Sequence, residues 1–183
     1  MRPDSLVVCY QGDGDLAAIG TAEIVHAAAR GERITAIFVN NGIYGMTGGQ
    51  MAPTTLLGQR TTSSPNGRDA ALMGYPIRIT EMLAQLPGVT YAARGTVADV
   101  ASIGKLKAMI KRACQVQIEG GGFALVEALS NCPVGWGMTP EESMEHLKGP
   151  VVEAYPLGVI VDRGTSAMPA ADTGCPAPAH PEA

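Results

Sequence analysis

The chain has 183 residues, enough for one ordinary domain, and 46% of them are hydrophobic while only 4% are aromatic, so the expected core is mainly aliphatic. A formal net charge of −4 excludes the basic surface of a general nucleic-acid-binding protein. Neither a signal peptide nor an apolar run long enough to span a membrane is evident, so we expect a soluble, cytoplasmic protein with no nucleic-acid or membrane partner.

The first forty residues predict a strand–helix–strand unit. Residues 5–10 form an apolar run with β-branched side chains, which is typical of a strand buried on both faces. Apolar residues dominate 16–29 without alternation, which favours a packed helix, and Gly31 is suited to end it. A second buried strand is expected over 34–39. This order predicts a right-handed crossover within a parallel sheet.

The rest of the chain continues the α/β pattern after a long irregular segment. Residues 42–76 show no periodicity, and loops of this length are usually functional or disordered. A helix is expected over 77–86, a strand over 89–93, a longer helix over 97–118 and a strand over 123–129. We therefore predict an α/β fold, a parallel sheet with helices on both faces.

The C-terminal part begins with a second irregular segment, residues 130–138. Thr139 and Pro140 have the form of an N-cap followed by a proline in the first helical position. We expect one domain over 1–163, and a disordered tail rich in alanine and proline over 164–183.

A glycine motif lies where the first strand is expected to end. It reads Gly12-Asp13-Gly14-Asp15, and with Ala17 it satisfies the spacing of a dinucleotide-binding turn. The carboxylates would repel a phosphate unless a cation lay between them. The acidic residue expected after the second strand of a dinucleotide-binding fold is also missing, because asparagines stand there. The dinucleotide hypothesis is therefore the weaker one.

A metal-bridged diphosphate resolves this conflict. Mg²⁺ prefers oxygen ligands and commonly takes carboxylates together with phosphates. Asp13 supplies a carboxylate after the first strand, and Asn41 supplies an amide oxygen after the second. If the two strands are neighbours, both oxygens face the crevice where open α/β sheets bind ligands. The sequence thus predicts a Mg²⁺–diphosphate site.

These strings resemble a known family. The motif GDG followed at this distance by NN is the signature of thiamine diphosphate enzymes. The longer string NNGIYGMTGGQMAPT, residues 40–54, is typical of a much smaller group of proteins. With EALSNCP at 127–133 and YPLG at 155–158, they look like the β subunit of the 2-oxoacid:ferredoxin oxidoreductases. The segment from Cys132 to Pro140 is closer to the 2-oxoisovalerate and 2-oxoglutarate members than to pyruvate members.

The resemblance implies the thiamine diphosphate-binding fold and a set of site residues. It implies Mg²⁺ ligands at Asp13, at the Asn41 side chain and at the Ile43 carbonyl, and a cofactor lined by Gly12, Gly14, Asp15, Gly45, Met46 and Thr47. Cys132 resembles the last cysteine ligand of a [4Fe–4S] cluster. No residue of this chain is assigned as catalytic, because the activating carboxylate of the family usually lies on a partner domain.

The sequence departs from the family pattern before the glycine motif. The usual N-terminal stretch with a CxxC-type motif is missing, and the cysteines at 9, 114, 132 and 175 are scattered, whereas such a cluster needs about four thiolates. A [4Fe–4S] cluster is therefore expected in the complex and is doubtful in this chain.

The resemblance implies a subunit that is inactive alone. The complex would contain pyrimidine-domain and γ-type chains, decarboxylate a 2-oxoacid oxidatively, form an acyl-CoA from coenzyme A and pass electrons to ferredoxin. The alternative is a truncated or degenerate subunit that keeps the fold as a non-catalytic docking partner. Replacing Asp13 by alanine is expected to abolish Mg²⁺-dependent cofactor retention and to leave the fold nearly intact.

Overall fold

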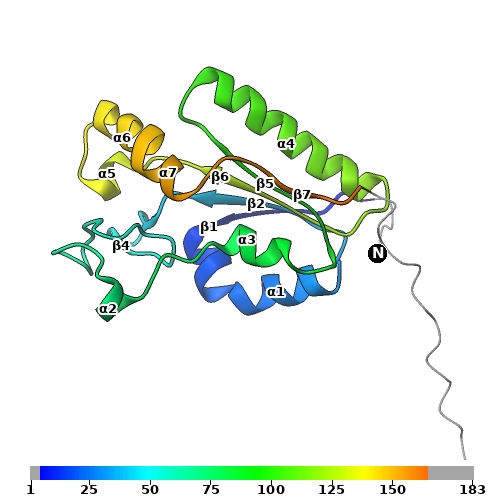
Figure 1. The fold of residues 1–183 in the computed structure, drawn as a ribbon, viewed down its shortest axis with the longest axis horizontal. Helices are drawn as coiled ribbons and strands as arrows, with labels where there is room; N and C mark the ends of the chain where they lie inside the picture. The colour runs from blue at the N-terminus through cyan, green and yellow to red at the C-terminus, as the bar shows by residue number, and fades with distance from the viewer. Residues whose placement is uncertain (1–4, 165–183) are drawn as a thin grey trace, which may run out of the picture.

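A five-stranded sheet forms the centre of the computed structural model, which describes residues 5–164 (Figure 1). Its strands are β1 (Val8–Gly12), β2 (Thr35–Asn40), β5 (Val89–Thr96), β6 (Phe123–Leu129) and β7 (Gly158–Asp162), in the order β1-β2-β6-β5-β7. The first four strands of this order are mutually parallel, and β7 runs antiparallel to β5 at the far edge. The predicted α/β fold is confirmed, with a sheet that is mostly and not wholly parallel.

Helices cover both faces of the sheet, as the sequence predicts. The helical elements are a π-helical turn η1 (Asp15–Ile19), α1 (Thr21–Ala29), α2 (Ala70–Met73), α3 (Ile79–Ala84), α4 (Val100–Ile118), α5 (Pro133–Trp136), α6 (Pro140–His146), a second π-helical turn η2 (Leu147–Val151) and α7 (Val152–Ala154). In Figure 1, α1 and α3 lie on one face and α4 lies on the other. None of the helices in the described residues is both long and apolar enough to cross a bilayer.

Each face of the sheet has its own aliphatic core. Leu16, Ile24 and Leu83 pack with the strand residues Phe38 and Leu125 beneath α1 and α3. On the opposite face a second cluster joins α4 to β5 and β6, and its buried members include Leu106, Ala113, Val116, Tyr91 and Val126. Burial of such side chains stabilises each by roughly 1.5–3 kcal/mol relative to exposure.

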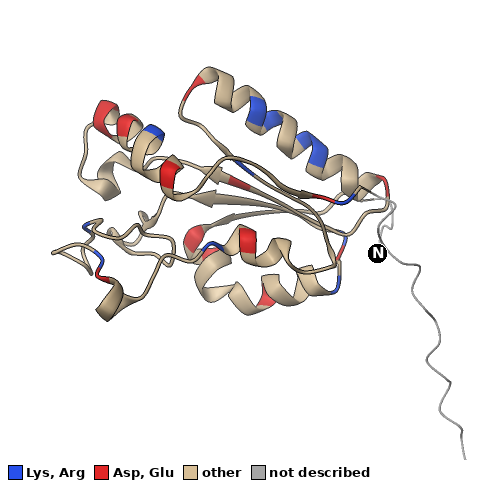
Figure 2. Ribbon diagram, viewed as in Figure 1, with Lys and Arg blue, Asp and Glu red and all other residues tan. Residues whose placement is uncertain are grey.

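The longest helix shows how the local sequence sets its ends. Asp99 caps α4, its carboxylate accepting a hydrogen bond from the Ser102 N–H at 2.7 Å. The helix ends at Ile118, before Gly120 takes the left-handed conformation at φ 85°. Lys105, Lys107 and Lys111 lie on its exposed face, which is visible as blue bands in Figure 2. The predicted cap of α6 is also present, because Thr139 and Glu142 form a reciprocal capping box.

Two sequence-based predictions about the fold are wrong, and one strand was not predicted. The first strand begins at Val8 and lies at the edge of the described sheet, and it is not buried on both faces, because Val8 and Tyr10 are exposed, Tyr10 by 75%. The helix expected over 16–29 is divided at Gly20, whose N–H bonds to the Asp15 carbonyl at 2.8 Å to close a wide turn. No strand was expected over Gly158–Asp162, where the structure has the antiparallel strand β7.

The long segment after β2 is ordered, although the sequence shows no periodicity there. It contains the antiparallel pair β3 (Ile43–Tyr44) and β4 (Gln50–Met51), and it is organised around the buried guanidinium of Arg68. Hydrogen bonds to carbonyl groups, rather than apolar alternation, hold this segment in place. The predicted tail lies outside the described residues except for Gly164.

Candidate cofactor-binding site

The candidate site lies at the carboxyl ends of β1 and β2. These strands are parallel neighbours, with Gly12 in register with Val39, so the residues that follow them leave the same edge of the sheet. A cavity of about 640 Å³ opens there. The cavity is lined by Gly12, Asp13, Gly14, Asp15, Ile19, Asn41, Ile43, Tyr44, Gly45, Met46, Thr47, Cys132 and Val134. Every site residue proposed from the sequence therefore lies in its wall.

The Asp13 carboxylate is the most buried polar group of this cavity, with 4% of the residue exposed. One oxygen accepts a hydrogen bond from the Gly14 N–H at 2.9 Å, and the other accepts from the Ile43 N–H at 3.2 Å and from the Thr54 hydroxyl at 3.3 Å. Burial raises the pKa of Asp13 above its ordinary value, although these hydrogen bonds oppose the rise. None of the ion pairs in the described part of the chain includes Asp13. Such a carboxylate suits a bound cation.

Asn41 brings a second oxygen to the same point. Its side-chain oxygen accepts a hydrogen bond from the Ile43 N–H at 3.1 Å, so Asp13 and Asn41 share one donor. The Asn41 carbonyl, in turn, accepts a hydrogen bond from the Trp136 indole at 2.9 Å, which ties this loop to α5. Two oxygen ligands of the type that Mg²⁺ prefers therefore converge from neighbouring strands.

These residues fit Mg²⁺ held jointly with a diphosphate. Protein oxygens of this kind, one carboxylate, one amide and backbone carbonyls, bind Mg²⁺ weakly by themselves. Phosphate oxygens commonly supply the remaining ligands in such sites. No group of three or more His, Cys, Asp or Glu side chains in residues 5–164 is placed to hold a metal ion. The carbonyl of Ile43 already accepts from the Gly45 N–H at 3.0 Å, and its second lone pair leaves room for a metal.

The glycine motif forms a close turn next to Asp13. The Asp15 carboxylate folds back onto the Gly12 N–H at 3.0 Å. At Gly14 the backbone is helical, and a Cβ atom would lie 2.9 Å from Cε1 of the Tyr44 ring. Burial, and then the charge of Asp13, raise the pKa of Tyr44, so its hydroxyl stays neutral at the mouth of the site. The lack of a side chain at Gly14 therefore leaves space for Tyr44.

Replacing Gly14 by alanine is expected to weaken thiamine diphosphate binding by about tenfold, because the new Cβ atom would lie 2.9 Å from the Tyr44 ring and such overpacking costs about 1–3 kcal/mol. The Tyr44 ring would have to turn away from the new methyl group. Gly104→Ala in α4 is the control, since open space surrounds that position. The control should bind normally and gain about 0.5–1 kcal/mol in the free energy of unfolding. Equal binding by both variants, measured by calorimetry, would contradict the assignment of Gly14.

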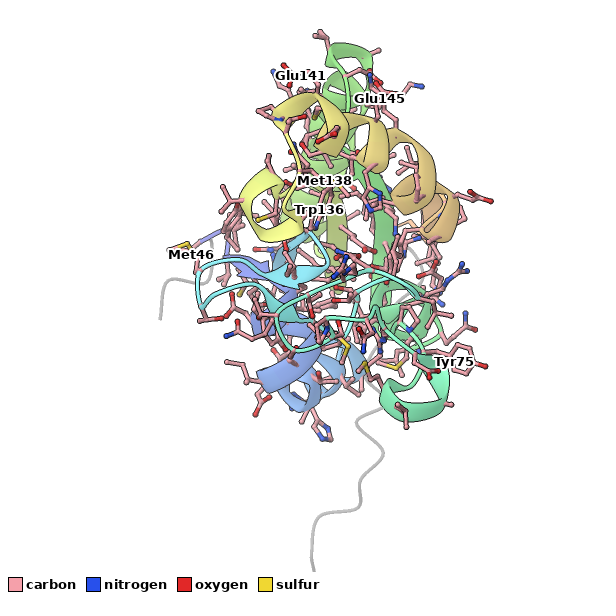
Figure 3. The ribbon with its side chains drawn as sticks, turned by 90° about the vertical axis from the view of Figure 1, so that its left-hand side faces the viewer. Met46, Tyr75, Trp136, Met138, Glu141 and Glu145 are labelled. Carbon is pink, nitrogen blue, oxygen red and sulfur yellow. The ribbon has the colours of Figure 1, made fainter. Side chains whose placement is uncertain are left out.

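The loop of Gly45, Met46 and Thr47 forms the outer wall of the cavity. Met46 is fully exposed, and Figure 3 shows it projecting away from the body of the molecule. The Thr47 hydroxyl donates to the Gln50 side-chain oxygen at 2.8 Å, which closes the turn between β3 and β4. The residues described in the structure therefore leave the Met46 side chain fully exposed beside the cavity.

Cys132 lies at the start of α5, in the same cavity wall. A Cβ atom at Gly45 or at Gly135 would lie 3.1 or 2.8 Å from its sulfur, so the thiol is packed against backbone. No second cysteine joins it among residues 5–164 in a group that could hold a metal. An iron–sulfur cluster does not fit these residues alone.

Sequence analysis missed residues that orient the site. Thr54 donates to Asp13, and Asn40, Glu127 and Arg94 form a buried network beneath the Asn41 loop. An arginine and a glutamate within otherwise apolar strands were signals of such a network. The Asp13 carboxylate is buried and accepts hydrogen bonds from Gly14, Ile43 and Thr54. Its replacement by alanine would leave these donors unpaired, so we expect that variant to lose stability as well as cofactor.

The strand order argues against a dinucleotide-binding fold. In the classic order of that fold, 3-2-1-4-5-6, the strand that carries the glycine motif has neighbours on both sides. Among residues 5–164, β1 pairs only with β2. The fold and the site together define a thiamine diphosphate-binding domain.

Comparison with known proteins agrees with this class. Residues 1–128 match the family described as "Thiamine pyrophosphate enzyme, C-terminal TPP binding domain". The ketoisovalerate oxidoreductase subunit VorA of Methanothermobacter marburgensis is 44% identical over 164 residues, which are 90% of this chain and 34% of that protein. The 2-oxoglutarate synthase subunit KorB of Methanocaldococcus jannaschii is 40% identical over 136 residues, which are 74% of this chain and 46% of that protein.

A solved structure is also similar. The 2-oxoglutarate:ferredoxin oxidoreductase from Magnetococcus marinus, with 2-oxoglutarate, coenzyme A and succinyl-CoA bound, matches 88% of this chain and 58% of its own, at 26% identity and a TM-score of 0.66. The chain belongs to the thiamine pyrophosphate enzymes, and within them to the family of the 2-oxoacid:ferredoxin oxidoreductase β subunits. It spans about a third to a half of the length of these two curated relatives.

Proposed function

We propose that this chain binds thiamine diphosphate and Mg²⁺ in a 2-oxoacid:ferredoxin oxidoreductase. The observation that carries the proposal is the convergence of the Asp13 and Asn41 side-chain oxygens on the Ile43 N–H, at one end of a large cavity. Such a complex would convert a 2-oxoacid to an acyl-CoA and pass electrons to ferredoxin. We propose the cytoplasm as its location, because coenzyme A and ferredoxin are intracellular.

The residues of this chain would bind and orient the cofactor. Asp13, Asn41 and the Ile43 carbonyl would hold Mg²⁺, and the turn at Gly12 and Gly14 would lie along the diphosphate. When bound, thiamine diphosphate supplies the carbanion chemistry that decarboxylation needs. Thr54 keeps the Asp13 carboxylate directed at the metal position through its hydroxyl. No side chain of the described cavity is proposed as the proton acceptor of the reaction.

A partner domain would close the cavity. Two apolar side chains of its wall, Ile19 and Val134, are 85% and 94% exposed, and Met46 is exposed beside them. Exposed apolar residues gathered at one opening are typical of a surface that another protein covers. This arrangement supports the pyrimidine-domain and γ-type chains as partners, with any iron–sulfur cluster completed by cysteines outside residues 5–164.

The proposed substrate is 2-oxoisovalerate, with 2-oxoglutarate as the second candidate. The similarity to the ketoisovalerate oxidoreductase subunit extends over 90% of the chain, against 74% for the 2-oxoglutarate synthase subunit. The test is anaerobic turnover of the purified complex with coenzyme A, a viologen acceptor and each 2-oxoacid in turn. The proposal expects the highest kcat/KM for 2-oxoisovalerate. Turnover of pyruvate alone would contradict it.

A further inference from the structure

Two charged residues lie in the interior of the sheet, directly beneath the candidate site. Arg94 on β5 and Glu127 on β6 are in register with each other, and both side chains are buried almost completely. Their ion pair has a distance of 2.7 Å, and Arg94 also forms an ion pair with Glu81 at 2.5 Å. Buried ion pairs contribute little net stability when compared with apolar residues, so this network calls for another explanation.

The two carboxylate oxygens of Glu127 have different hydrogen-bond partners. One carboxylate oxygen accepts from the Arg94 guanidinium at 2.7 Å and from the Thr80 hydroxyl at 2.5 Å. The other oxygen accepts from the side-chain amide of Asn40 at 2.7 Å. A carboxylate paired with arginine only accepts hydrogen bonds, so Asn40 must direct its NH₂ group toward Glu127. The Asn40 oxygen must then point in the opposite direction.

The orientation of Asn40 determines how the next residues turn. Its side-chain oxygen accepts from the Gly42 N–H at 3.1 Å. Gly42 has φ 66°, which favours glycine, and its carbonyl accepts from the Thr55 hydroxyl at 2.6 Å. This turn directs the Asn41 side chain onto the Ile43 N–H, beside Asp13. The buried charge of Glu127 is therefore connected to the metal-binding loop through one amide group.

We infer that Glu127 and Asn40 are positioning residues, which hold the turn from Asn41 to Ile43 in the geometry that binds Mg²⁺. The metal part of this inference rests on the proposed function, whereas the effect on the turn does not. Outer partners that orient metal ligands commonly contribute 10–100-fold to metal affinity. Thr80 contacts the same carboxylate from α3 without contacting Asn40, so it supplies a matched control.

The test compares Asn40→Ala with Thr80→Val in two measurements. The first is hydrogen–deuterium exchange of the Gly42 and Ile43 amides without metal or cofactor. The second is the Mg²⁺ dissociation constant with thiamine diphosphate present. Asn40→Ala should speed exchange at both amides and weaken Mg²⁺ binding by 10–100-fold. Thr80→Val should leave exchange at both amides unchanged and alter the dissociation constant by less than about threefold, even if its Tm falls equally.

A second variant covers the case in which Asn40→Ala does not fold. In Glu127→Gln the single oxygen is expected to pair with the Arg94 cation, so the new NH₂ group faces Asn40 and inverts its amide. The inverted amide would place an NH₂ group against the Gly42 N–H, and exchange there should again accelerate. Wild-type exchange in Asn40→Ala or in Glu127→Gln, or equal losses in Thr80→Val, would overturn the inference. A wild-type protein that binds no Mg²⁺ would overturn the proposed function instead, and the exchange data would still decide the role of Asn40.

Discussion

Replacing Asp13 by asparagine is expected to weaken Mg²⁺-dependent binding of thiamine diphosphate by at least about 100-fold, since a carboxylate–metal contact in a low-dielectric site stabilises by several kcal/mol. Asparagine keeps the shape of the side chain but replaces one acceptor oxygen by an NH₂ group, so either the Gly14 N–H or the Ile43 N–H and the Thr54 hydroxyl lose their acceptor. The variant therefore removes the charge and one acceptor together, with less loss of packing than alanine causes. The measurement is calorimetric titration of the cofactor with Mg²⁺ and, separately, with EDTA.

The control for this variant is Asp15→Asn. Asp15 lies in the same turn and accepts from the Gly12 N–H, but its side chain has no contact with Ile43 or Thr54. Its loss should reduce affinity by less than about tenfold, as expected for a single hydrogen bond. If Asp13→Asn bound the cofactor as tightly as the wild type, Asp13 would not be the metal ligand.

Replacing Arg68 by alanine is expected to lower the free energy of unfolding by about 3–5 kcal/mol. The guanidinium is buried and donates to the carbonyls of Ala52, Pro53, Thr55, Met73, Gly74 and Tyr75. Hydrogen bonds from charged donors contribute about 1.5–3 kcal/mol each, and some of these carbonyls would regain water after the substitution. Burial lowers the pKa of Arg68, which nevertheless remains charged at neutral pH.

The same substitution should also impair the site. Thr54 and Thr55 belong to the segment that Arg68 holds, and they bond to Asp13 and to the Gly42 carbonyl. Urea unfolding of the metal-free protein gives the stability. Arg60→Ala is the control, because Arg60 is exposed and its guanidinium donates to the Pro65 carbonyl of the same loop. The control should change stability by less than about 1 kcal/mol. A loss of less than 1 kcal/mol for Arg68→Ala would contradict the role given to that residue.

The fold was predictable from the sequence where a strand is fully buried or a helix is long, because such elements have a clear pattern of apolar residues. The predicted strand over 123–129 coincides with β6, and the helix over 97–118 begins three residues earlier than α4 and ends with it. At the edge strand β1, however, an apolar run faces solvent, and apolar composition alone does not reveal which strands lie at an edge. The break at Gly20 follows the π-helical turn η1, and the apolar pattern of residues 16–29 does not distinguish such a turn from a continuous α-helix.

The site was predictable only in its local part. Asp13 and Asn41 follow neighbouring strands, so their proximity could be inferred from the strand–helix–strand order. The hydrogen bonds from Thr54 to Asp13 and from Asn40 to Glu127 join residues that are 41 and 87 positions apart. Such contacts result from the packing of the whole domain. In the sequence, the contact between Asn40 and Glu127 was indicated only by the charged residues Arg94 and Glu127 within the otherwise apolar segments of β5 and β6.

The central claim is that this chain holds thiamine diphosphate through Mg²⁺ as part of a larger oxidoreductase. Native mass spectrometry of the tagged protein, recovered from its own host under anaerobic conditions, tests this claim most directly. We predict a complex with further subunits that carries one thiamine diphosphate and Mg²⁺ for each copy of this chain. A protein that is recovered alone, without the cofactor, and does not take it up when Mg²⁺ is added would contradict the claim.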